Sequence, residues 1–385
     1  MLRQIIHTTL YTLLAISLLA MGSCVTEERE IPTPQPTRVL LAYIGVDNNL
    51  SGFEQEKIDG LRNGWTGKKT DRIFAYIDNR TDGAKLYDLS VDATSDPLLL
   101  SCYGAEDSAS AETFSRVVVE VISNYKAESY GLLVFSHASG WLPQGALTNP
   151  HKAKDTRSII IDGTKEMELA DFAHAIPDGV FDYIAFEACF MAGIEVAYEL
   201  RNKADYILAS SAEIVHPGFA PVYEASTGKL LTGNLTGFGQ SVFNHTLTYA
   251  ETELQHSATY SVIQTSKLQD LADFIRLNCD FEKEITITEI QHFDRYSYRL
   301  FFDFEGYYGR LLEADTQRAE LARLIDNCVT WKAATPGFMN QQSGYNGFTI
   351  NNHSGLTTYI PQEQFTGLNE AYNGLSWTKA ITLQP

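Results

Sequence analysis

The sequence predicts an α/β fold built on a mostly parallel sheet with helices on both faces. Five short apolar runs, each bounded by polar or turn residues, have the length and composition of strands that are buried on both faces. They are RVLLAYIG from Arg38, RIFAYID from Arg72, GLLVFSH from Gly131, DYIAFEA from Asp182 and DYILASS from Asp205. Amphipathic, helix-like stretches precede the last three runs, at 111–125, 165–176 and 192–203. This alternation is typical of parallel strands joined by right-handed crossovers.

The C-terminal part of the chain has a more helical pattern. After about Thr265, helix-like stretches cover 266–277 and 309–332, and the strand-like GFTIN and GLTTYIP follow from Gly347 and Gly355. We therefore predict a main α/β domain over 39–265. A C-terminal helical subdomain over 266–385 would return to the core of that domain.

Composition excludes several classes of protein. The chain has 385 residues, 44% hydrophobic and 20% charged, which is enough for one large or two modest domains. Its formal charge of −19 argues against a nucleic-acid partner, because phosphate binding needs clustered Lys and Arg. No HExxH, Walker A, GxGxxG or CxxC pattern occurs, so we expect no metal site and no cofactor. We expect a monomer.

The N-terminus resembles the signal of a bacterial lipoprotein. Arg3 precedes an apolar stretch over 10–20, which is too short to cross a bilayer of about 30 Å, and small residues stand before Cys24. We expect 1–23 to be a signal peptide and Cys24 to carry the lipid, with 24–38 as a Pro-rich tether to the membrane. The acidic residues behind Cys24 resemble a surface-export signal. The prediction is an outer-membrane lipoprotein at the cell surface, or alternatively one that faces the periplasm.

Two of the apolar runs end on a reactive side chain. In open parallel sheets, sites gather at the carboxyl ends of the strands, where one run delivers His137 and another delivers Cys189. Of nine histidines, only His137 directly follows an apolar run. The alternative for Cys189 is a buried core thiol, the role that we expect for the three cysteines Cys102, Cys279 and Cys328.

A cysteine and a histidine at neighbouring strand ends indicate nucleophilic catalysis. The thiolate attacks a carbonyl, and activation of the thiol requires an imidazole, a helix N-terminus, or both. His137 would supply the imidazole, which later protonates the leaving amine. A helix opening near Gly193 would favour the thiolate. Backbone N–H groups of Ala138 and Cys189 would stabilise the oxyanion.

These motifs resemble the clostripain family, the C11 cysteine peptidases of the caspase-like clan. The similarity is carried by VFSHASGW from Val134 and by FEACFMAGIEVAYELRNKADYILAS from Phe186. The opening LAYIGVDNNLSGFE, with Asp47, Asn48 and Asn49, and the late SGLTTYIP also resemble this family. The resemblance implies a caspase-like α/β/α sandwich, endopeptidase activity on protein or peptide substrates, and a dyad of His137 and Cys189.

Two positions depart from the family pattern. Ala138 stands where the family usually has glycine, and alanine tolerates fewer backbone angles. Members that cleave after Arg or Lys have aspartate two residues before the cysteine, whereas this chain has Glu187. The resemblance thus implies a basic P1 preference through Glu187, with Glu213 as a second pocket acid. A strand-end salt bridge is the alternative role of Glu187.

Some members of the family cleave themselves between the histidine and the cysteine, and some are activated by calcium. The polar segment NPHKAKDTRS offers Lys152, Lys154 and Arg157 as sites of self-cleavage. Acidic loops such as DNRTDG lack EF-hand spacing, so the sequence does not support a calcium site.

Two rival functions fit parts of the sequence. A noncatalytic surface lipoprotein that binds peptide or glycan, such as an inactive relative of the peptidases, would use the 20 Tyr and 20 Phe. A serine hydrolase could use Ser136 or Ser139, but the GxSxG elbow is absent. A general binding lipoprotein or a serine hydrolase does not explain a cysteine and a histidine at two strand ends, although an inactive relative of the peptidases could retain the pair.

Overall fold

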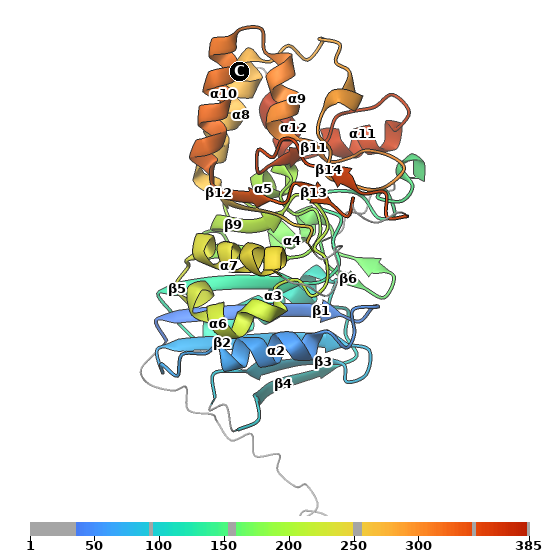
Figure 1. Cartoon of the computed structure of the whole chain (residues 1–385). Helices are drawn as coiled ribbons and strands as arrows, with labels where there is room; N and C mark the ends of the chain where they lie inside the picture. Colours follow the sequence, from blue (N-terminus) through green and yellow to red (C-terminus); the bar gives the residue numbers. More distant parts are fainter. Residues whose placement is uncertain (1–35, 92–94, 153–158, 249–255, 341–343, 383–385) are drawn as a thin grey trace, which may run out of the picture. The chain divides into compact units, whose positions relative to one another are not determined.

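A nine-stranded sheet organises the protein (Figure 1). The computed structural model describes residues 36–91, 95–152, 159–248, 256–340 and 344–382, which fall in one compact unit. The strand order is β12-β10-β9-β8-β5-β1-β2-β3-β4. The five predicted runs form the central strands and are mutually parallel: β1 (Arg38–Val46), β2 (Asp71–Asn79), β5 (Ser129–Phe135), β8 (Phe181–Glu187) and β9 (Ala204–Ser210). The predicted α/β fold is confirmed.

Antiparallel pairs, which the sequence did not indicate, extend the sheet at both edges. They are β3 (Ala84–Asp88) with β4 (Leu98–Gly104) on one side, and β10 (Thr259–Gln264) with β12 (Val329–Ala334) on the other. Short two-stranded sheets lie outside the main sheet: β6 (Ile161–Asp162) with β7 (Lys165–Glu166), β11 (Phe302–Asp303) with β15 (Thr357–Thr358), and β13 (Gly337–Phe338) with β14 (Phe348–Thr349).

Helices cover both faces of the sheet, as Figure 1 shows. One face carries α2 (Glu54–Asn63), α6 (Ala220–Leu231) and α7 (Leu235–Thr248). The other face carries α3 (Ala111–Asn124), α4 (Leu169–Ala175) and α5 (Ile194–Glu199). The C-terminal helices are α8 (Leu268–Asn278), α9 (Phe304–Leu311), α10 (Asp315–Cys328), α11 (Thr366–Asn373) and α12 (Ser376–Thr382). The described residues also form the short 3-10 helices η1 (Pro150–Lys152), η3 (Thr265–Lys267) and η4 (Ile287–Glu289).

The double covering explains why the central strands are apolar at almost every position. Successive residues of a strand point to opposite faces, so each strand contributes to two apolar cores. In β1, the residues that pack toward α2 and α6 are Leu40, Ala42 and Ile44. The alternate residues, which pack toward α3, are Val39, Leu41 and Tyr43.

Two local predictions are wrong. Residues 329–332, predicted as the end of a helix, form strand β12, because their backbone pairs with β10 at the sheet edge. Cys102, expected as a core thiol, is exposed because edge strand β4 has only β3 beside it. Cys328 is buried, as expected, whereas Cys279 is only partly buried. The proposed boundary between residues 265 and 266 stays a prediction.

The strand order creates a crevice at the carboxyl ends of β1 and β5. From β1 the chain passes through α2 to β2 on one side, and β5 lies on the other side of β1. Loops that leave two adjacent parallel strands toward opposite faces open a crevice, where ligands of open α/β sheets bind. The loop after β1 carries Asn49, and the loop after β5 carries His137.

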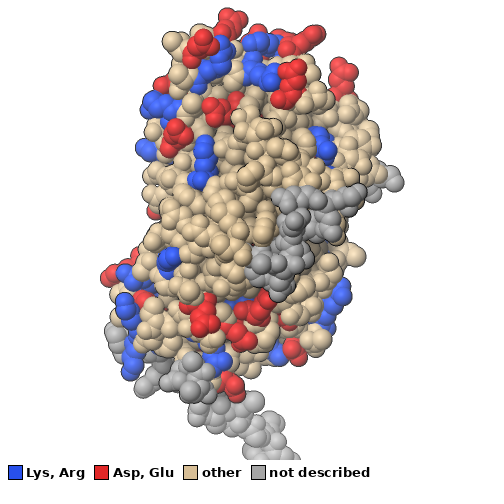
Figure 2. Space-filling view, viewed as in Figure 1, with Lys and Arg blue, Asp and Glu red and all other residues tan. Residues whose placement is uncertain are grey.

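The predicted lipidation site Cys24, the signal peptide and most of the tether lie outside the described residues. Within the described part, none of the helices combines the length and the apolar character needed to cross a membrane. On the face drawn in Figure 2, charged side chains gather toward the upper and lower parts, and both signs are mixed in each.

Candidate active site

His137 and Cys189 leave neighbouring parallel strands at the same level. In the pairing of β5 with β8, Phe135 lies opposite Glu187. His137 is two residues after Phe135, and Cys189 is two residues after Glu187. Both side chains are partly buried and line one cavity of about 600 Å³. The fold therefore brings the two predicted catalytic residues to one place.

A strained turn holds the cysteine loop. Phe190 has φ 62°, which is uncommon for a non-glycine residue. Its ring stacks on Phe301 with centroids 4.4 Å apart, and its N–H donates to the carbonyl of Ala212 at 3.0 Å. Gly140 allows the histidine loop to approach, because a Cβ at Gly140 would lie 2.7 Å from the Phe190 carbonyl oxygen. Packing thus fixes the turn that presents Cys189.

Asn49 orients the histidine. Nε2 of His137 lies 2.7 Å from Oδ1 of Asn49. An amide oxygen only accepts, so Nε2 carries the proton and Nδ1 of the neutral imidazole is left as the acceptor. Neighbouring Asn48 holds the loop by donating to the carbonyl of Ile161 at 2.7 Å. In the sequence Asn49 is only part of the DNN motif, and its contact with His137, 88 positions away, exists only in the folded chain.

Burial favours the neutral form of both reactive groups. It raises the pKa of the Cys189 thiol to about 12, with Glu213 adding to the rise, and it lowers the pKa of His137 below its ordinary 6.5. The N–H of Ile214 reaches Sγ at 3.4 Å and partly offsets this rise. Helix α5 has its N-cap at Gly193, where we expected it. The expectation that this N-terminus favours the thiolate stays a prediction.

The two backbone groups predicted for the oxyanion are available. Within the described ranges, neither the N–H of Ala138 nor that of Cys189 donates a hydrogen bond. Ala138 does not have a positive φ, so the residue that replaces the family's glycine is accommodated without strain. Ser136 has another role, because its hydroxyl accepts the N–H of Ile161 at 3.1 Å.

Glu187 lines the cavity as a buried, fully bonded carboxylate. Oε1 pairs with Nζ of Lys57 at 2.8 Å and accepts the N–H of Phe219 at 2.7 Å. Oε2 accepts the hydroxyl of Tyr223 at 2.6 Å. Glu187 is 3% exposed and Lys57 is likewise 3% exposed. The strand-end salt bridge that was the alternative role of Glu187 therefore exists.

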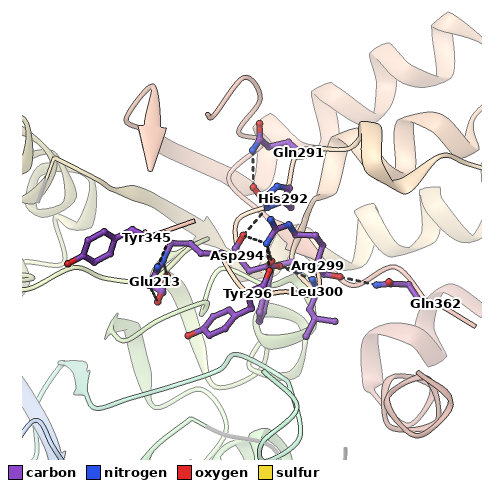
Figure 3. Close-up of polar contacts among 11 residues, drawn as sticks. Glu213, Gln291, His292, Asp294, Tyr296, Arg299, Leu300, Tyr345 and Gln362 are labelled. Carbon is purple, nitrogen blue, oxygen red and sulfur yellow. Dashed lines mark hydrogen bonds and ion pairs between the residues drawn. The ribbon is translucent and has the colours of Figure 1, made fainter. Parts of the chain in front are cut away.

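Glu213 also lines the cavity and is also paired. Arg295 donates to it through Nε at 2.5 Å and through Nη2 at 2.9 Å. The loop of Arg295 is held by Asp294, which accepts the N–H of Leu300 at 2.7 Å and the guanidinium of Arg299 at 3.3 Å (Figure 3). Both acids expected to receive a basic side chain thus have an internal cation as partner.

The predicted self-cleavage segment is only partly described. Lys152 ends η1, and Lys154 and Arg157 lie outside the described residues. Just before this segment, Gly145, Leu147 and Thr148 line the cavity. Among the described residues, no group of three or more His, Cys, Asp or Glu side chains is arranged to hold a metal ion.

Known proteins resemble this chain over most of its length. The sequence profile of the clostripain family matches residues 42–377. A C11 protease from Parabacteroides distasonis, solved as an inactive zymogen, is 29% identical with a TM-score of 0.77, and the match covers 92% of this chain and 100% of that one. A secreted C11 cysteine protease from Bacteroides thetaiotaomicron, solved with an irreversible peptide inhibitor, is 25% identical with a TM-score of 0.76, covering 90% and 99%.

A curated relative matches over a shorter region. Clostripain from Hathewaya histolytica is 23% identical over 214 residues, which are 47% of this chain. The matched region spans 40% of the length of that relative.

Proposed function

The chain belongs to the clostripain family, and from this premise we propose that it is a cysteine endopeptidase with Cys189 as nucleophile and His137 as general base and acid. The observation that carries the proposal is the shared level of the two residues beyond the paired strands β5 and β8, on one cavity. The two similar C11 protease structures support it.

The proposed reaction starts from a neutral pair. As Sγ of Cys189 attacks the peptide carbonyl, Nδ1 of His137 takes the thiol proton, and Nε2–H keeps its bond to Asn49. The N–H groups of Ala138 and Cys189 stabilise the oxyanion. The imidazolium then protonates the leaving amine, which leaves an acyl-enzyme, and a water molecule deprotonated by His137 releases the acid.

The preference at P1, the residue whose carbonyl is attacked, depends on Glu187 and Glu213. Their position on the cavity wall supports a preference for Arg or Lys. Their ion pairs with Lys57 and Arg295 oppose it, because a basic substrate side chain would have to compete with an internal cation.

We further propose self-processing and lipid anchoring. The segment 149–158 would be cut, with Lys152, Lys154 and Arg157 as the basic candidates, since it directly follows residues that line the cavity. The Parabacteroides relative was solved as an inactive zymogen. If purified wild-type and Cys189→Ala chains both remain intact, self-processing is excluded.

Lipid on Cys24 would hold the protein on the outer membrane, facing outward. Impermeant surface labelling of intact cells tests this orientation, and protection until the outer membrane is breached would indicate a periplasmic face. A Cys24→Ala variant that stays with the membrane fraction would exclude the lipid anchor.

Turnover of peptides tests the main proposal. Wild-type and Cys189→Ala chains are incubated with a pool of quenched fluorescent peptides, and cleavage should fall by about 10⁴-fold or more in the variant. Equal cleavage by both chains would exclude Cys189 as nucleophile. If the folded wild-type chain cleaves no peptide, the noncatalytic binding lipoprotein becomes the better hypothesis.

A further inference from the structure

The cavity beside Cys189 contains an internal ion pair where a substrate side chain would bind. Glu187 is two residues before the nucleophile, at the end of β8, and Lys57 reaches it from α2. Their side chains meet at 2.8 Å, with exposed fractions of 1% and 3%. Both residues line the cavity. A side chain that enters here therefore meets a compensated pair and not a free carboxylate.

The carboxylate has little remaining capacity for a ligand. Besides Lys57, the N–H of Phe219 and the hydroxyl of Tyr223 donate to it. Gly218, with φ +66°, allows the loop to close over the carboxylate, because a Cβ at this position would lie 2.3 Å from Oε1. A new cation would have to break existing bonds of Glu187 to gain its own.

Lys57 is fixed in place by more than its partner. Its Nζ lies 4.2 Å from the ring centroid of Phe135, the last residue of β5, which adds a cation–π contact. Glu56 lies 3.6 Å away on the exposed side. A buried lysine held by a carboxylate and an aromatic ring cannot move to solvent without leaving Glu187 unpaired, which is strongly unfavourable.

The remaining wall near the nucleophile is largely apolar. It includes Phe53, Phe135, Ala188, Ile214 and Val215. Glu213 is paired with Arg295, as described above. Glu166 also lines the cavity, but from β7, which is not part of the main sheet.

We propose that Lys57 is a specificity-determining residue that cancels the charge of Glu187, so that the cavity admits a neutral, apolar P1 side chain and rejects Arg and Lys. The inference rests on the proposed function, because it assumes that the residue beside Cys189 is P1. An acidic P1 side chain is rejected for the same reason, since Lys57 is already paired. This inference competes with self-cleavage after Lys152, Lys154 or Arg157, because it places any cut within 149–158 after a neutral residue. The N-terminal sequence of a processed fragment would decide between the two.

Binding to an inactive chain tests this without turnover. The full chain with Cys189→Ala is titrated with labelled peptides that differ only at P1, carrying norleucine, lysine or glutamate, and anisotropy is measured. Norleucine has the aliphatic chain of lysine without the ammonium group, so comparing these two peptides measures the effect of the P1 charge alone. Norleucine should bind at least about tenfold more tightly than either charged residue.

Two complementary variants in this inactive background assign the effect to the ion pair. Lys57→Met leaves Glu187 without its cation partner. The lysine peptide should then bind about tenfold more tightly, relative to the norleucine peptide, than it does to the starting chain. Glu187→Gln leaves Lys57 with only the exposed Glu56 as an acidic partner, so this variant should tighten the binding of the glutamate peptide relative to the norleucine peptide. If one variant does not give a cooperative melt, the other still tests the proposal. Lys203→Met, which removes a lysine paired with Asp178 away from the cavity, should leave every ratio unchanged.

The outcomes separate this inference from the proposed function. If the starting chain binds the lysine peptide more tightly than the norleucine peptide, the inference is overturned. This holds even if Glu166→Gln abolishes the preference and so assigns it to Glu166, another acid that lines the cavity. A folded Lys57→Met chain with ratios within about twofold of the starting chain also overturns it, as does failure to bind any of the peptides. Selective binding together with no cleavage by the wild-type chain would refute the peptidase proposal alone.

Discussion

The two buried glutamates on either side of Cys189 have opposite environments. Glu187 ends β8 and faces the cavity, where a lysine, a backbone N–H and a tyrosine hydroxyl satisfy it. Glu195, in α5, is 0% exposed and has no cation partner among the described residues. It accepts the N–H of Tyr359 at 2.8 Å and the hydroxyl of Thr358 at 3.0 Å.

The difference teaches what each carboxylate can do. Burial without a cation partner disfavours the ionised form of a carboxyl group. Burial accordingly raises the pKa of Glu195 to about 7, and its Oε2 has no hydrogen-bond partner within the described part of the chain. Glu195 ties α5 to β15 and does not line the cavity; we call this region, away from the cavity, the buried side. Glu187 lines the cavity, and we call this region the cavity side.

Two histidines extend the comparison. His137 lies on the cavity side, and its Nδ1 is left as an acceptor. His353 lies on the buried side, where Nε2 contacts the hydroxyl of Ser211 at 3.1 Å. Burial lowers the pKa of His353 to about 3. Both rings are neutral near pH 7, but only His137 shares a cavity with Cys189.

The largest expected effect comes from replacing each of these histidines by alanine. His137→Ala should lower kcat/KM for peptide cleavage by about 10³- to 10⁴-fold, because the thiol loses its base. His353→Ala should stay within about threefold of wild type and cost about 1 kcal/mol of stability through a lost hydrogen bond. Steady-state kinetics and denaturant unfolding measure both. Comparable kinetic losses in the two variants would remove the distinction between the two sides.

The next effect concerns stability on the buried side. The pKa of Glu195 rises from 4.5 to about 7 on folding, so its contribution is fully present below pH 4.5 and is lost as pH rises toward 7. Glu195→Gln removes this loss. The stability of the variant relative to wild type should therefore increase by about 3 kcal/mol between pH 4.5 and pH 7.5.

Urea unfolding at several pH values measures this difference. Glu199→Gln, on the same helix but partly exposed, is the matched control and should show a much smaller change. A pH-independent difference between Glu195→Gln and wild type would mean that folding does not shift the pKa of Glu195.

Asn49 gives a smaller effect on the cavity side. Asn49→Ala should lower kcat about 10- to 30-fold, because the ring of His137 loses the acceptor that fixes its orientation. Asn49→Asp keeps an acceptor but adds a charge beside Nε2, which should raise the pKa of His137 and move the acid limb of kcat/KM to higher pH. A structural role alone would lower activity in both variants without moving that limb.

The smallest effect concerns the pH dependence of activity in the wild-type chain, specifically the pH at which activity falls on the acid side. Because His137 must be neutral to accept the proton and burial lowers its pKa, activity should rise with pH around a midpoint below 6.5. No descending limb from Cys189 should appear up to pH 9, since its thiol has a pKa of about 12. A bell-shaped profile with a basic limb between pH 7 and 8 would indicate a preformed thiolate–imidazolium pair instead.

The sequence by itself determined the five central strands and the placement of His137 and Cys189 at two of their ends. Both follow from local patterns, because an apolar run covered on both faces and a reactive residue directly after it can be recognised within one segment. Strand β12 was misread as helix because its partner β10 lies 70 residues earlier, measured from Val329 to Thr259. Pairing at an edge leaves little trace in the sequence of either strand.

Only the tertiary structure decided the charge of the cavity. Glu187 could be read from its distance to the cysteine, but Lys57 is 130 positions away, and Asn49 is 88 positions from His137. The crossovers that bring α2 and the loop after β1 to the ends of β5 and β8 place these partners together. Because an ion pair acts through space and not along the chain, the sequence identified the acid while the fold supplied its counter-charge.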